Sequence, residues 1–312
     1  MKKIIVTGAT GQIGSELVVE LRKKYGNENV VAVGYSAPQH GEEHAGPFAT
    51  VDVTDAAAVT ELLQQHKPDT LFHLVGILSA TGEKDPELAW NVNIGGLKNI
   101  LDAAREHGVK QIFWPSSIAA FGPTTPRDDT PQQTVLEPTT MYGVTKVTGE
   151  LLCQYYWKKY GLDIRSLRYP GLISYKTPPG GGTTDYAVAI YFDAKHKGSY
   201  ECFVGPETVL PMMYMPDGVR ATIELMEAPQ EKISIRTSYN LAAISFSASE
   251  LAASVARQVP GFTCTYAPDE RQKIADSWPR SIDDSAARKD WNWNHAFDLD
   301  AMTADMLANI PS

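Results

Sequence analysis

Cysteine is scarce in this chain of 312 residues. Only Cys153, Cys202 and Cys264 occur, widely spaced and without a Cys-x-x-Cys pair. That spacing indicates neither a zinc knuckle nor a disulfide framework, and it suits a reducing compartment. His40 and His44 stand in a glycine-containing stretch, where we interpret them as solvent-exposed loop histidines and expect no metal site.

Clusters of basic residues and long apolar runs are also absent. The formal net charge is −9, which argues against a nucleic-acid-binding surface. Glycines interrupt the first apolar stretch well before the length of a signal-peptide core or a membrane span. With 43% hydrophobic and 21% charged residues, the composition is that of an ordinary globular protein. We therefore expect a cytoplasmic protein that binds neither nucleic acid nor membrane.

The first half of the chain alternates short, β-branched apolar runs with amphipathic stretches of helical length. This alternation is typical of βαβ units around a parallel sheet, and right-handed crossovers then predict an α/β fold of the Rossmann type with a doubly wound parallel sheet. The predicted strands are 3–7, 30–33, 48–51, 70–74, 111–115 and 163–168. The predicted helices are 12–25, 59–65, 88–107 and 142–160. Asp55 is a predicted helix start.

The composition changes after Arg168, where Pro178, Pro179 and the glycines 180–182 break any regular element. Beyond them the sequence predicts helices at 186–197 and 217–227 and strands at 200–204 and 239–241. We predict an NAD-binding Rossmann domain over 1–173, with a return strand near 238–242. A smaller C-terminal domain over 174–312 is expected to bind substrate or act as a lid.

A glycine-rich turn follows the first predicted strand. The segment TGATGQIG, residues 7–14, places glycines at three-residue intervals between a strand and a helix. Such a turn lets the backbone approach a pyrophosphate, and the helix N-terminus offers unpaired N–H groups and a favourable dipole. Taken alone, the motif could also be a tight turn that binds nothing. The residues expected to bind a dinucleotide here are Gly8, Gly11, Gln12, Ile13 and Gly14.

The acidic residue that often follows the second strand of dinucleotide-binding folds is missing. Gly34, Tyr35 and Ser36 occupy its place, and no Arg or Lys stands there to bind a 2′-phosphate, so we expect NAD. Ser36 could bond a ribose hydroxyl. Asp52, followed by Val53 after the third strand, could meet the adenine end.

Tyr142 and Lys146 form a Tyr-x-x-x-Lys pair, whose i, i+4 spacing puts both side chains on one helix face. A phenol is a poor base at neutral pH, but a nearby ammonium and the nicotinamide cation favour the phenolate. Tyr142 can then accept a hydroxyl proton while Lys146 bonds the nicotinamide ribose. The same pair also occurs by chance on ordinary surface helices.

Two serines strengthen the catalytic interpretation by their position. The fifth predicted strand ends in Pro115-Ser116-Ser117, where the strand's carboxyl end places side chains near the topological switch point. Ser117 could donate to the reacting oxygen, with Ser116 as an assisting contact. Either serine could instead only cap the strand end.

Three motifs together resemble the extended short-chain dehydrogenase/reductase family, which contains nucleotide-sugar epimerases and dehydratases. They are TGATGQIG from Thr7, the strand-end Ser116-Ser117 and YGVTK from Tyr142. Four longer segments resemble the members of that family that oxidise L-threonine, and they extend nearly to the C-terminus. These are HLVGILSATGEKDPELAWNVNIGG from His73, WPSSIAAFGP from Trp114, RYPGLISYKTPPGGGTTDYAV from Arg168 and DSWPRSIDDSAARKDWNW from Asp276.

The resemblance implies further cofactor contacts. Tyr169 and Pro170 are expected to border the nicotinamide, Leu74 and Gly76 to lie on the ribose and phosphate side, and Asn93 to support the cofactor region. Gly34 departs from the family pattern, in which an acidic residue is common.

The resemblance also implies a substrate site for an amino acid. Ser79, Thr184 and Asp185 are expected to contact it together with Ser117 and Tyr142, and the glycine-rich segment to close over it. The chemistry of an amino-acid zwitterion supports part of this set, because the ammonium group of the substrate needs a hydrogen-bond acceptor such as Asp185.

The reaction implied is oxidation of L-threonine at C3 to 2-amino-3-ketobutyrate with hydride transfer to NAD, carried out by a homodimer that pairs around Leu97 and Leu151. Two alternatives remain. A nucleotide-sugar epimerase or dehydratase would use the same Ser, Tyr and Lys. The residues after 174 contain no basic cluster that would bind the diphosphate of such a substrate. A non-catalytic dinucleotide sensor would need the glycine turn only.

Overall fold

The computed structural model describes residues 1–36, 45–180 and 182–311, so His40, His44 and Gly181 lie outside the described residues. The contacts within the chain divide it into two compact units. Unit 1 comprises Met1–Ser116, Thr140–Arg168 and Val219–Tyr239, and unit 2 comprises Ser117–Thr139, Tyr169–Gly218 and Asn240–Ser312.

A seven-stranded sheet forms the centre of unit 1, in the order β10-β6-β5-β4-β1-β2-β3. The strands are β1(Ile4–Thr7), β2(Val30–Gly34), β3(Phe48–Thr50), β4(Thr70–His73), β5(Gln111–Ser117), β6(Asp163–Tyr169) and β10(Tyr239–Asn240). β1 runs parallel to both β2 and β4, β2 to β3, and β4 to β5. Since strand order reverses on either side of β1, the sheet is doubly wound, which confirms the predicted α/β Rossmann-type fold.

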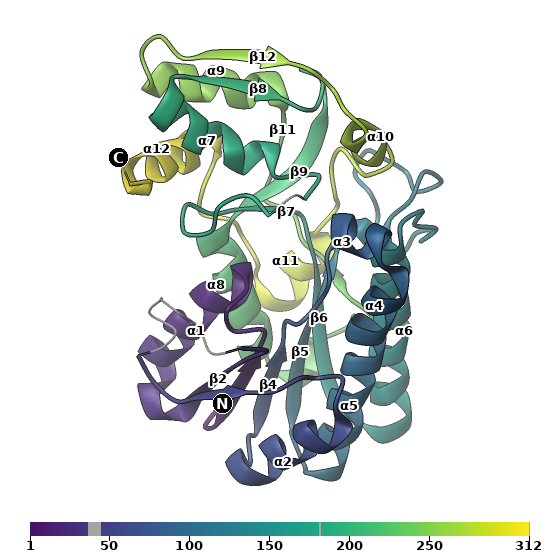
Figure 1. Cartoon of the computed structure of the whole chain (residues 1–312). Coiled ribbons are helices and arrows are strands. Elements are labelled where there is room, and N and C mark those ends of the chain that lie inside the picture. Colours follow the sequence, from purple (N-terminus) through teal and green to yellow (C-terminus); the bar gives the residue numbers. More distant parts are fainter. Residues whose placement is uncertain (37–44, 181, 312) are drawn as a thin grey trace. The chain divides into compact units, whose positions relative to one another are not determined.

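Helices cover this sheet, and most begin where the sequence predicts. They are α1(Gln12–Tyr25), α2(Ala56–His66), α3(Ser79–Lys84), α4(Pro86–Trp90), α5(Gly96–Glu106), α6(Met141–Tyr160) and α8(Met215–Glu227). In Figure 1, α4, α5 and α6 run along one side of the sheet. Asp55 caps α2 as predicted, because its Oδ1 accepts the N–H groups of Ala57 and Ala58 at 2.9 and 3.1 Å.

The helix predicted over 88–107 differs from the structure in its middle. A π turn, η3(Asn91–Gly95), joins α4 to α5. A π turn accommodates one residue more than an α turn, and such turns often mark functional sites. Apolar periodicity does not reveal it, because the apolar residues on both sides fit an α-helical pattern.

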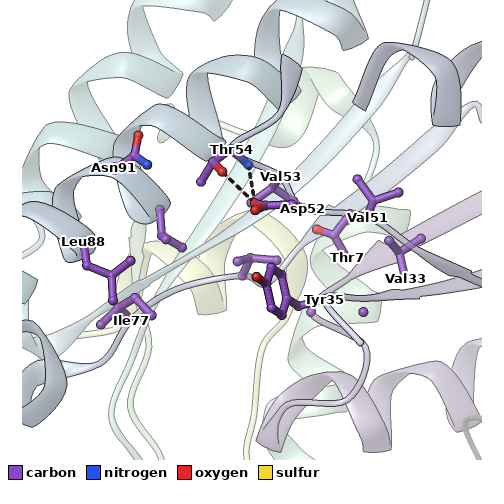
Figure 2. Close-up of a pocket in the computed structure, with 14 residues that line it drawn as sticks. Thr7, Val33, Tyr35, Val51, Asp52, Val53, Thr54, Ile77, Leu88 and Asn91 are labelled. Carbon is purple, nitrogen blue, oxygen red and sulfur yellow. Dashed lines mark hydrogen bonds between the residues drawn. The ribbon is translucent and has the colours of Figure 1, made fainter. Parts of the chain in front are cut away.

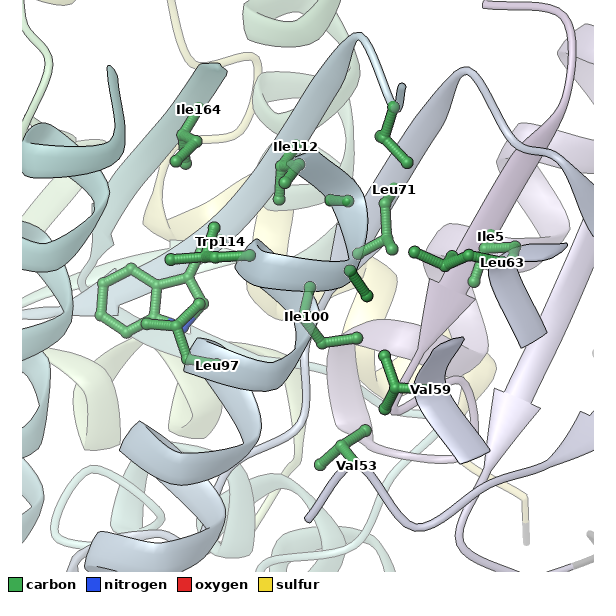
Figure 3. Packing of buried hydrophobic residues seen from close by; sticks show 14 of the residues in the cluster. Ile5, Val53, Val59, Leu63, Leu71, Leu97, Ile100, Ile112, Trp114 and Ile164 are labelled. Atoms are coloured by element: carbon green, nitrogen blue, oxygen red, sulfur yellow. The ribbon is translucent and has the colours of Figure 1, made fainter. Parts of the chain in front are cut away.

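The core of unit 1 lies between the sheet and the helices α2, α5 and α6. Figure 3 shows Leu97 and Ile100 of α5 pointing at Trp114, Ile112 and Leu71 of the strands. All five side chains are buried, and each such aliphatic side chain contributes about 1.5–3 kcal/mol relative to exposure. This packing fixes the carboxyl ends of the strands, where the candidate site residues stand.

Unit 2 contains two small sheets and the remaining helices. One sheet has the order β11-β9-β7, and the other pairs β12 with β8. The elements are β7(Gly171–Ile173), β8(Ser199–Cys202), β9(Val209–Tyr214), β11(Ile244–Ser247), β12(Thr263–Tyr266), α7(Tyr186–Lys197), α9(Ala248–Gln258), α10(Arg271–Asp276), α11(Ser285–Trp291) and α12(Leu299–Asn309). α7, α9 and α12 pack together. Short 3-10 helices at Asn27–Asn29, Ile118–Ala120 and Gln230–Lys232 lie in the connections between larger elements of the chain.

The helices of the described residues do not meet the requirements of a membrane span. None of them is both long enough and apolar enough to cross a bilayer.

Candidate active site

The glycine turn between β1 and α1 is a backbone cradle that side chains would fill. Gly8 has φ +74°, and a Cβ there would lie 2.9 Å from the amide nitrogen of Val75. The Gly11 N–H closes the turn on the Gly8 carbonyl at 3.1 Å. A Cβ on Gly14 would overlap that same carbonyl. Space therefore requires glycine at positions 8 and 14, and at Gly8 the left-handed backbone conformation favours it as well.

The first turn of α1 opens directly from this cradle. Gly11 is the N-cap, and no side chain caps the helix. Gln12 and Ile13 begin the helix, so their N–H groups belong to the positive end of its dipole. An anion such as a pyrophosphate is the ligand that this terminus favours. The cradle and the helix end therefore fit the diphosphate of a dinucleotide.

A pocket of about 490 Å³ lies beside the cradle, at the carboxyl ends of β1, β2, β3 and β4. Figure 2 shows Leu88 and Ile77 at one end and Val33 and Val51 at the other. The lining residues are Thr7, Gly8, Val33, Gly34, Tyr35, Val51, Asp52, Val53, Thr54, Val75, Ile77, Leu88, Asn91 and Val92. A mainly apolar cleft of this size at the strand ends suits an adenine nucleoside.

Asp52 is the charged residue among those that line this pocket. Its Oδ1 accepts the N–H and the hydroxyl of Thr54, at 2.9 and 2.7 Å, as Figure 2 shows. Two bonds to one oxygen hold the carboxylate in a fixed direction. A fixed acceptor in the pocket could bond ribose hydroxyls or the adenine amino group.

The missing acidic residue at position 34 has a steric explanation. A Cβ on Gly34 would lie 2.9 Å from the carbonyl oxygen of Ser36 and 3.0 Å from Cζ of Phe48. Any side chain would have to displace one of these groups. Tyr35 lines the pocket next to Gly34, and Ser36 is exposed without being among the lining residues.

Asn93 connects the pocket to α6. Its Oδ1 accepts the Ile77 N–H at 2.7 Å, and its Nδ2 donates to the Ile77 carbonyl at 3.1 Å and to the Thr145 hydroxyl at 3.0 Å. Thr145 in turn donates to the carbonyl of Tyr142 at 2.8 Å. Asn93 supports the segment after β4 through hydrogen bonds, which is consistent with the supporting role expected from the resemblance.

The segment after β4 contributes both to the pocket and to the surroundings of the glycine turn. Val75 and Ile77 line the pocket, whereas Leu74 and Gly76, expected on the ribose and phosphate side, do not; a Cβ on Gly8 would lie 3.0 Å from the carbonyl carbon of Leu74, so Leu74 adjoins the cradle. The Leu74 N–H donates to the Thr7 carbonyl at 3.0 Å, which extends the pairing of β4 with β1. Successive residues of an extended segment face opposite sides. Val75 and Ile77 therefore face one side of the segment, and Leu74 and Gly76 face the other.

Sequence reasoning missed most of the pocket, although some signals were present. Asp52 and Thr54 have the spacing of a turn in which the aspartate accepts the threonine's N–H and hydroxyl. Leu88, Asn91 and Val92 stand three and four residues apart, which puts them on one helix face. Their position opposite the strand ends depends on tertiary packing, which local patterns do not contain.

Tyr142 and Lys146 lie on one face of α6, as predicted from their spacing. Lys146 is buried, and its Nζ donates to the carbonyl of Pro115 at 2.6 Å. The same Nζ lies 5.2 Å from the centroid of the Tyr142 ring and 4.7 Å from that of Trp114. Burial lowers the pKa of Lys146 to about 7, while the nearby Glu150 carboxylate opposes that shift.

The two serines at the end of β5 have different surroundings. Ser116 is buried and its hydroxyl donates to Glu150 Oε1 at 2.6 Å, so it faces the interior. Ser117 is half-buried, and its Oγ accepts the Ala119 N–H at 3.2 Å, capping the 3-10 helix Ile118–Ala120. Ser117 thus acts as a cap at the end of β5. A hydroxyl that accepts one hydrogen bond can still donate another, so the cap leaves the Ser117 hydroxyl able to donate to a ligand.

His73, the last residue of β4, is an additional buried group near Lys146. Its Nδ1 lies 2.8 Å from the Thr7 hydroxyl. Burial, followed by the charge of Lys146, lowers the pKa of His73 to about 3, so the ring is neutral. Its Nε2 is buried and has no hydrogen-bond partner among the described residues.

The residues expected to contact substrate occur in both units. Ser79 is buried at the start of α3 in unit 1. In unit 2, Thr184 packs against the backbone of Gly171, and Oδ2 of Asp185 accepts the N–H groups of Gly180 and Gly182 at 2.7 and 2.8 Å. The carboxylate of Asp185 is therefore held by two backbone N–H groups, those of Gly180 and Gly182.

The expected nicotinamide neighbours lie where β6 leads into β7. Tyr169 ends β6 and Pro170 follows it, and both are buried. Among the residues that the structure describes, no group of three or more His, Cys, Asp or Glu side chains could hold a metal ion.

Comparison with known proteins gives a consistent set of similarities. Residues 4–242 match the model of the NAD dependent epimerase/dehydratase family. An uncharacterized epimerase/dehydratase from Staphylococcus haemolyticus is 51% identical over 99% of this chain and 98% of its own length.

Two solved structures are similar over nearly the whole chain. The holo form of an L-threonine dehydrogenase from Cupriavidus necator is 51% identical, with a TM-score of 0.96 over 99% of this chain and 100% of that one. An L-threonine dehydrogenase from Clostridium difficile is 49% identical, with a TM-score of 0.97 over 99% and 98%.

Proposed function

We infer the reaction from one premise, that this chain belongs to the NAD-dependent epimerase/dehydratase family. Membership confirms the expected enzyme family and NAD as the cofactor. Within the family we propose that the protein oxidises L-threonine at C3 to 2-amino-3-ketobutyrate, a step of threonine catabolism. The buried Lys146 Nζ between the Pro115 carbonyl and the Tyr142 ring supports the redox chemistry of the family, and the similarity to L-threonine dehydrogenases over nearly the whole chain carries the choice of substrate.

The described residues fit NAD in their shape and donor set. The cradle of Gly8, Gly11 and Gly14, with the first turn of α1, would hold the pyrophosphate, and Asp52 would meet the adenosine end. When bound, NAD supplies the hydride acceptor. Lys146 would bond the nicotinamide ribose, with Tyr169 and Pro170 bordering the ring.

Tyr142 is proposed as the general base. The cationic Nζ of Lys146, 5.2 Å from its ring, favours the phenolate over the phenol. Ser117 would donate its hydroxyl proton in a hydrogen bond to the reacting oxygen, which orients the C3 hydroxyl toward Tyr142. Proton loss to the Tyr142 oxygen then accompanies departure of the C3 hydrogen as hydride.

The amino-acid part of the substrate requires charged and polar contacts. We propose that Asp185 supplies negative charge for the ammonium and that Thr184 and Ser79 bond the carboxylate or hydroxyl. The bonds from Gly180 and Gly182 fix the direction of the Asp185 carboxylate. In this assignment residues 1–173 mainly bind NAD and residues 174–312 mainly bind substrate.

The first experiment follows absorbance of reduced nicotinamide with purified protein, L-threonine and NAD. We expect an increase that requires both, with little increase for NADP, L-serine or D-threonine. Tyr142→Phe should lose nearly all turnover while still binding NAD. No reduction with any amino acid, together with turnover of a UDP-sugar, would replace this proposal with an epimerase reaction.

We also propose a homodimer formed through α6. Val144, Leu151 and Tyr155 are exposed apolar side chains at i, i+7 and i+11, so they share one face of that helix. Leu97, expected at this interface, is instead fully buried in the core of unit 1. One similar solved structure is that of a monomeric L-threonine 3-dehydrogenase, so the oligomeric state of this chain has to be measured. Light scattering should give a dimer mass that Leu151→Glu reduces to that of one chain.

A further inference from the structure

A third polar residue continues the face of α6 that carries Tyr142 and Lys146. Glu150 stands one helical turn beyond Lys146, and its side chain is 1% exposed. A carboxylate at such depth is costly unless it is paired and fully hydrogen-bonded. The proposed reaction assigns it no task.

The partners of Glu150 come from two neighbouring strands of unit 1. Arg168, near the end of β6, donates from Nε to Oε1 at 2.8 Å and from Nη2 to Oε2 at 2.7 Å. Ser116, near the end of β5, donates to Oε1 at 2.6 Å. Two parallel bonds from a guanidinium fix the direction of the carboxylate more firmly than a single charge contact. The network therefore joins α6 to the carboxyl ends of β5 and β6.

The end of β5 that this network holds also carries the groups around Lys146. Pro115, whose carbonyl accepts the Lys146 Nζ at 2.6 Å, precedes Ser116, and Ser117 follows it. Displacement of Ser116 would move both of its neighbours in the chain. These are Pro115, whose carbonyl accepts the hydrogen bond from Lys146, and Ser117. Hydrogen-bond geometry weakens steeply with such displacement.

We propose that Glu150, held by Arg168 and Ser116, is a positioning residue that keeps the Lys146 ammonium charged and fixes the strand end bearing Ser117. The inference deepens the proposed function and rests on it. Glu150 acts through Lys146 and Ser116.

The charge of Glu150 acts in the same direction as the hydrogen-bond network that holds it. Burial lowers the pKa of Lys146, and the Glu150 carboxylate is the foremost group that raises it again. Without that carboxylate Lys146 should lose its proton at lower pH. An uncharged Lys146 no longer favours the Tyr142 phenolate.

Unit 1 offers a matched control at the opposite ends of the same strands. Asp163 begins β6 and forms a buried ion pair with Arg165 at 2.8 Å, and Gln111, which begins β5, donates to it at 3.2 Å. Strand rise of about 3.3 Å per residue puts the two networks roughly 16 Å apart. Asp163→Asn should therefore lower stability without reaching Lys146.

The experiment measures Lys146 directly by NMR, following its Cε signal with pH in protein labelled with ¹³C-lysine and assigned with Lys146→Gln. In Glu150→Gln we expect the titration midpoint to fall by about one pH unit relative to the wild type. Because that variant leaves Arg168 buried without its partner, E150Q/R168Q provides a second test in which both charges are removed; loss of the Arg168 cation partly offsets loss of the carboxylate, so its midpoint should fall less than that of Glu150→Gln. Asp163→Asn should keep the wild-type midpoint.

Turnover provides the second readout. The alkaline limb of the pH–rate profile should move to lower pH in Glu150→Gln by about the same amount as the Lys146 midpoint, and by less in E150Q/R168Q. Ser116→Ala should lower kcat about tenfold with little change in KM for NAD, and Ser116→Thr should restore part of the loss.

The outcomes separate the two proposals. An unchanged Lys146 midpoint in both Glu150 variants overturns the positioning role, whether or not the wild type oxidises L-threonine. A lowered midpoint supports it even in the absence of threonine turnover, a result that would count against the proposed reaction alone. An equal shift in Asp163→Asn would reduce Glu150 to a general structural residue.

Discussion

Asn93 binds both polar groups of the Ile77 backbone, accepting its N–H at 2.7 Å and donating to its carbonyl at 3.1 Å. The Asn93 amide thus makes the two hydrogen bonds that a neighbouring strand would otherwise make to Ile77, which lies beyond the end of β4. Ile77 lines the pocket, so the shape of the pocket depends on a residue of η3 that does not line it.

Asn93→Leu should weaken NAD binding more than it weakens the fold. The substitution leaves the Ile77 backbone groups without their partner, at a cost of about 1–3 kcal/mol for each buried group. Calorimetric titration with NAD should show an affinity loss of roughly ten- to a hundredfold. Asn309→Ala removes a comparable side-chain bond to a carbonyl, on α12, and should leave affinity unchanged. Equal affinities for wild type and Asn93→Leu would contradict the supporting role of Asn93.

Gly14→Ala should abolish NAD binding. A methyl group there overlaps the Gly8 carbonyl, so either the turn or α1 must shift. Gly205→Ala is the control, because a Cβ at that position meets its nearest atom only at 3.7 Å. Retention of tight NAD binding by Gly14→Ala would show that the cradle is not the pyrophosphate site.

Gly34→Asp should weaken NAD binding even though it restores the acidic residue common in dinucleotide folds. The new Cβ meets the Ser36 carbonyl at 2.9 Å and Phe48 at 3.0 Å, so one of these two groups must move. Titration with NAD and NADP measures this, and we expect affinity for both to fall. A gain in NAD affinity would mean that Ser36 or Phe48 moves at little cost.

His73 should make the protein acid-sensitive. Because the folded state lowers its pKa from 6.5 to about 3, the unfolded state binds more protons between these values. The contribution of neutral His73 to the free energy of unfolding is complete above pH 6.5 and is lost as the pH falls toward 3, on the order of 5 kcal/mol in all. Urea unfolding at several pH values should show a flatter dependence for His73→Asn over this window. The same slope in both proteins would assign acid sensitivity to other groups.

The sequence predicted the large sheet well because its signals are local. The run Ile4–Thr7, the glycines after it and the helix Gln12–Tyr25 each follow from composition and spacing within a few residues. The pair Tyr142 and Lys146 followed from helical periodicity in the same way. Burial of Lys146 against Pro115 did not, because it depends on residues about thirty positions apart meeting in the fold.

Unit 2 was predicted only in part. Its helix α7 matches the predicted range 186–197, whereas its strands are short, and β9, with the sequence VLPMMY, was not predicted because it lacks polar alternation and contains Pro211. Ser116 is a similar case at the site itself. Its sequence position resembles that of Ser117, yet its partner Glu150 belongs to another element, so only the structure separates the two serines.

The π turn between α4 and α5 has a consequence for how the gene could change length. Leu88, Asn91 and Val92 face the pocket before and within the turn, whereas Leu97, Ile100 and Leu101 face the core after it. Because a π turn holds one residue more than an α turn, deleting one codon within Asn91–Gly95 would turn η3 into ordinary α-helix while both sets keep their directions. A one-residue deletion within α5 would instead rotate the residues on its two sides by about 100° relative to each other, so we expect the chain to tolerate loss of one residue within η3 far better than within α5.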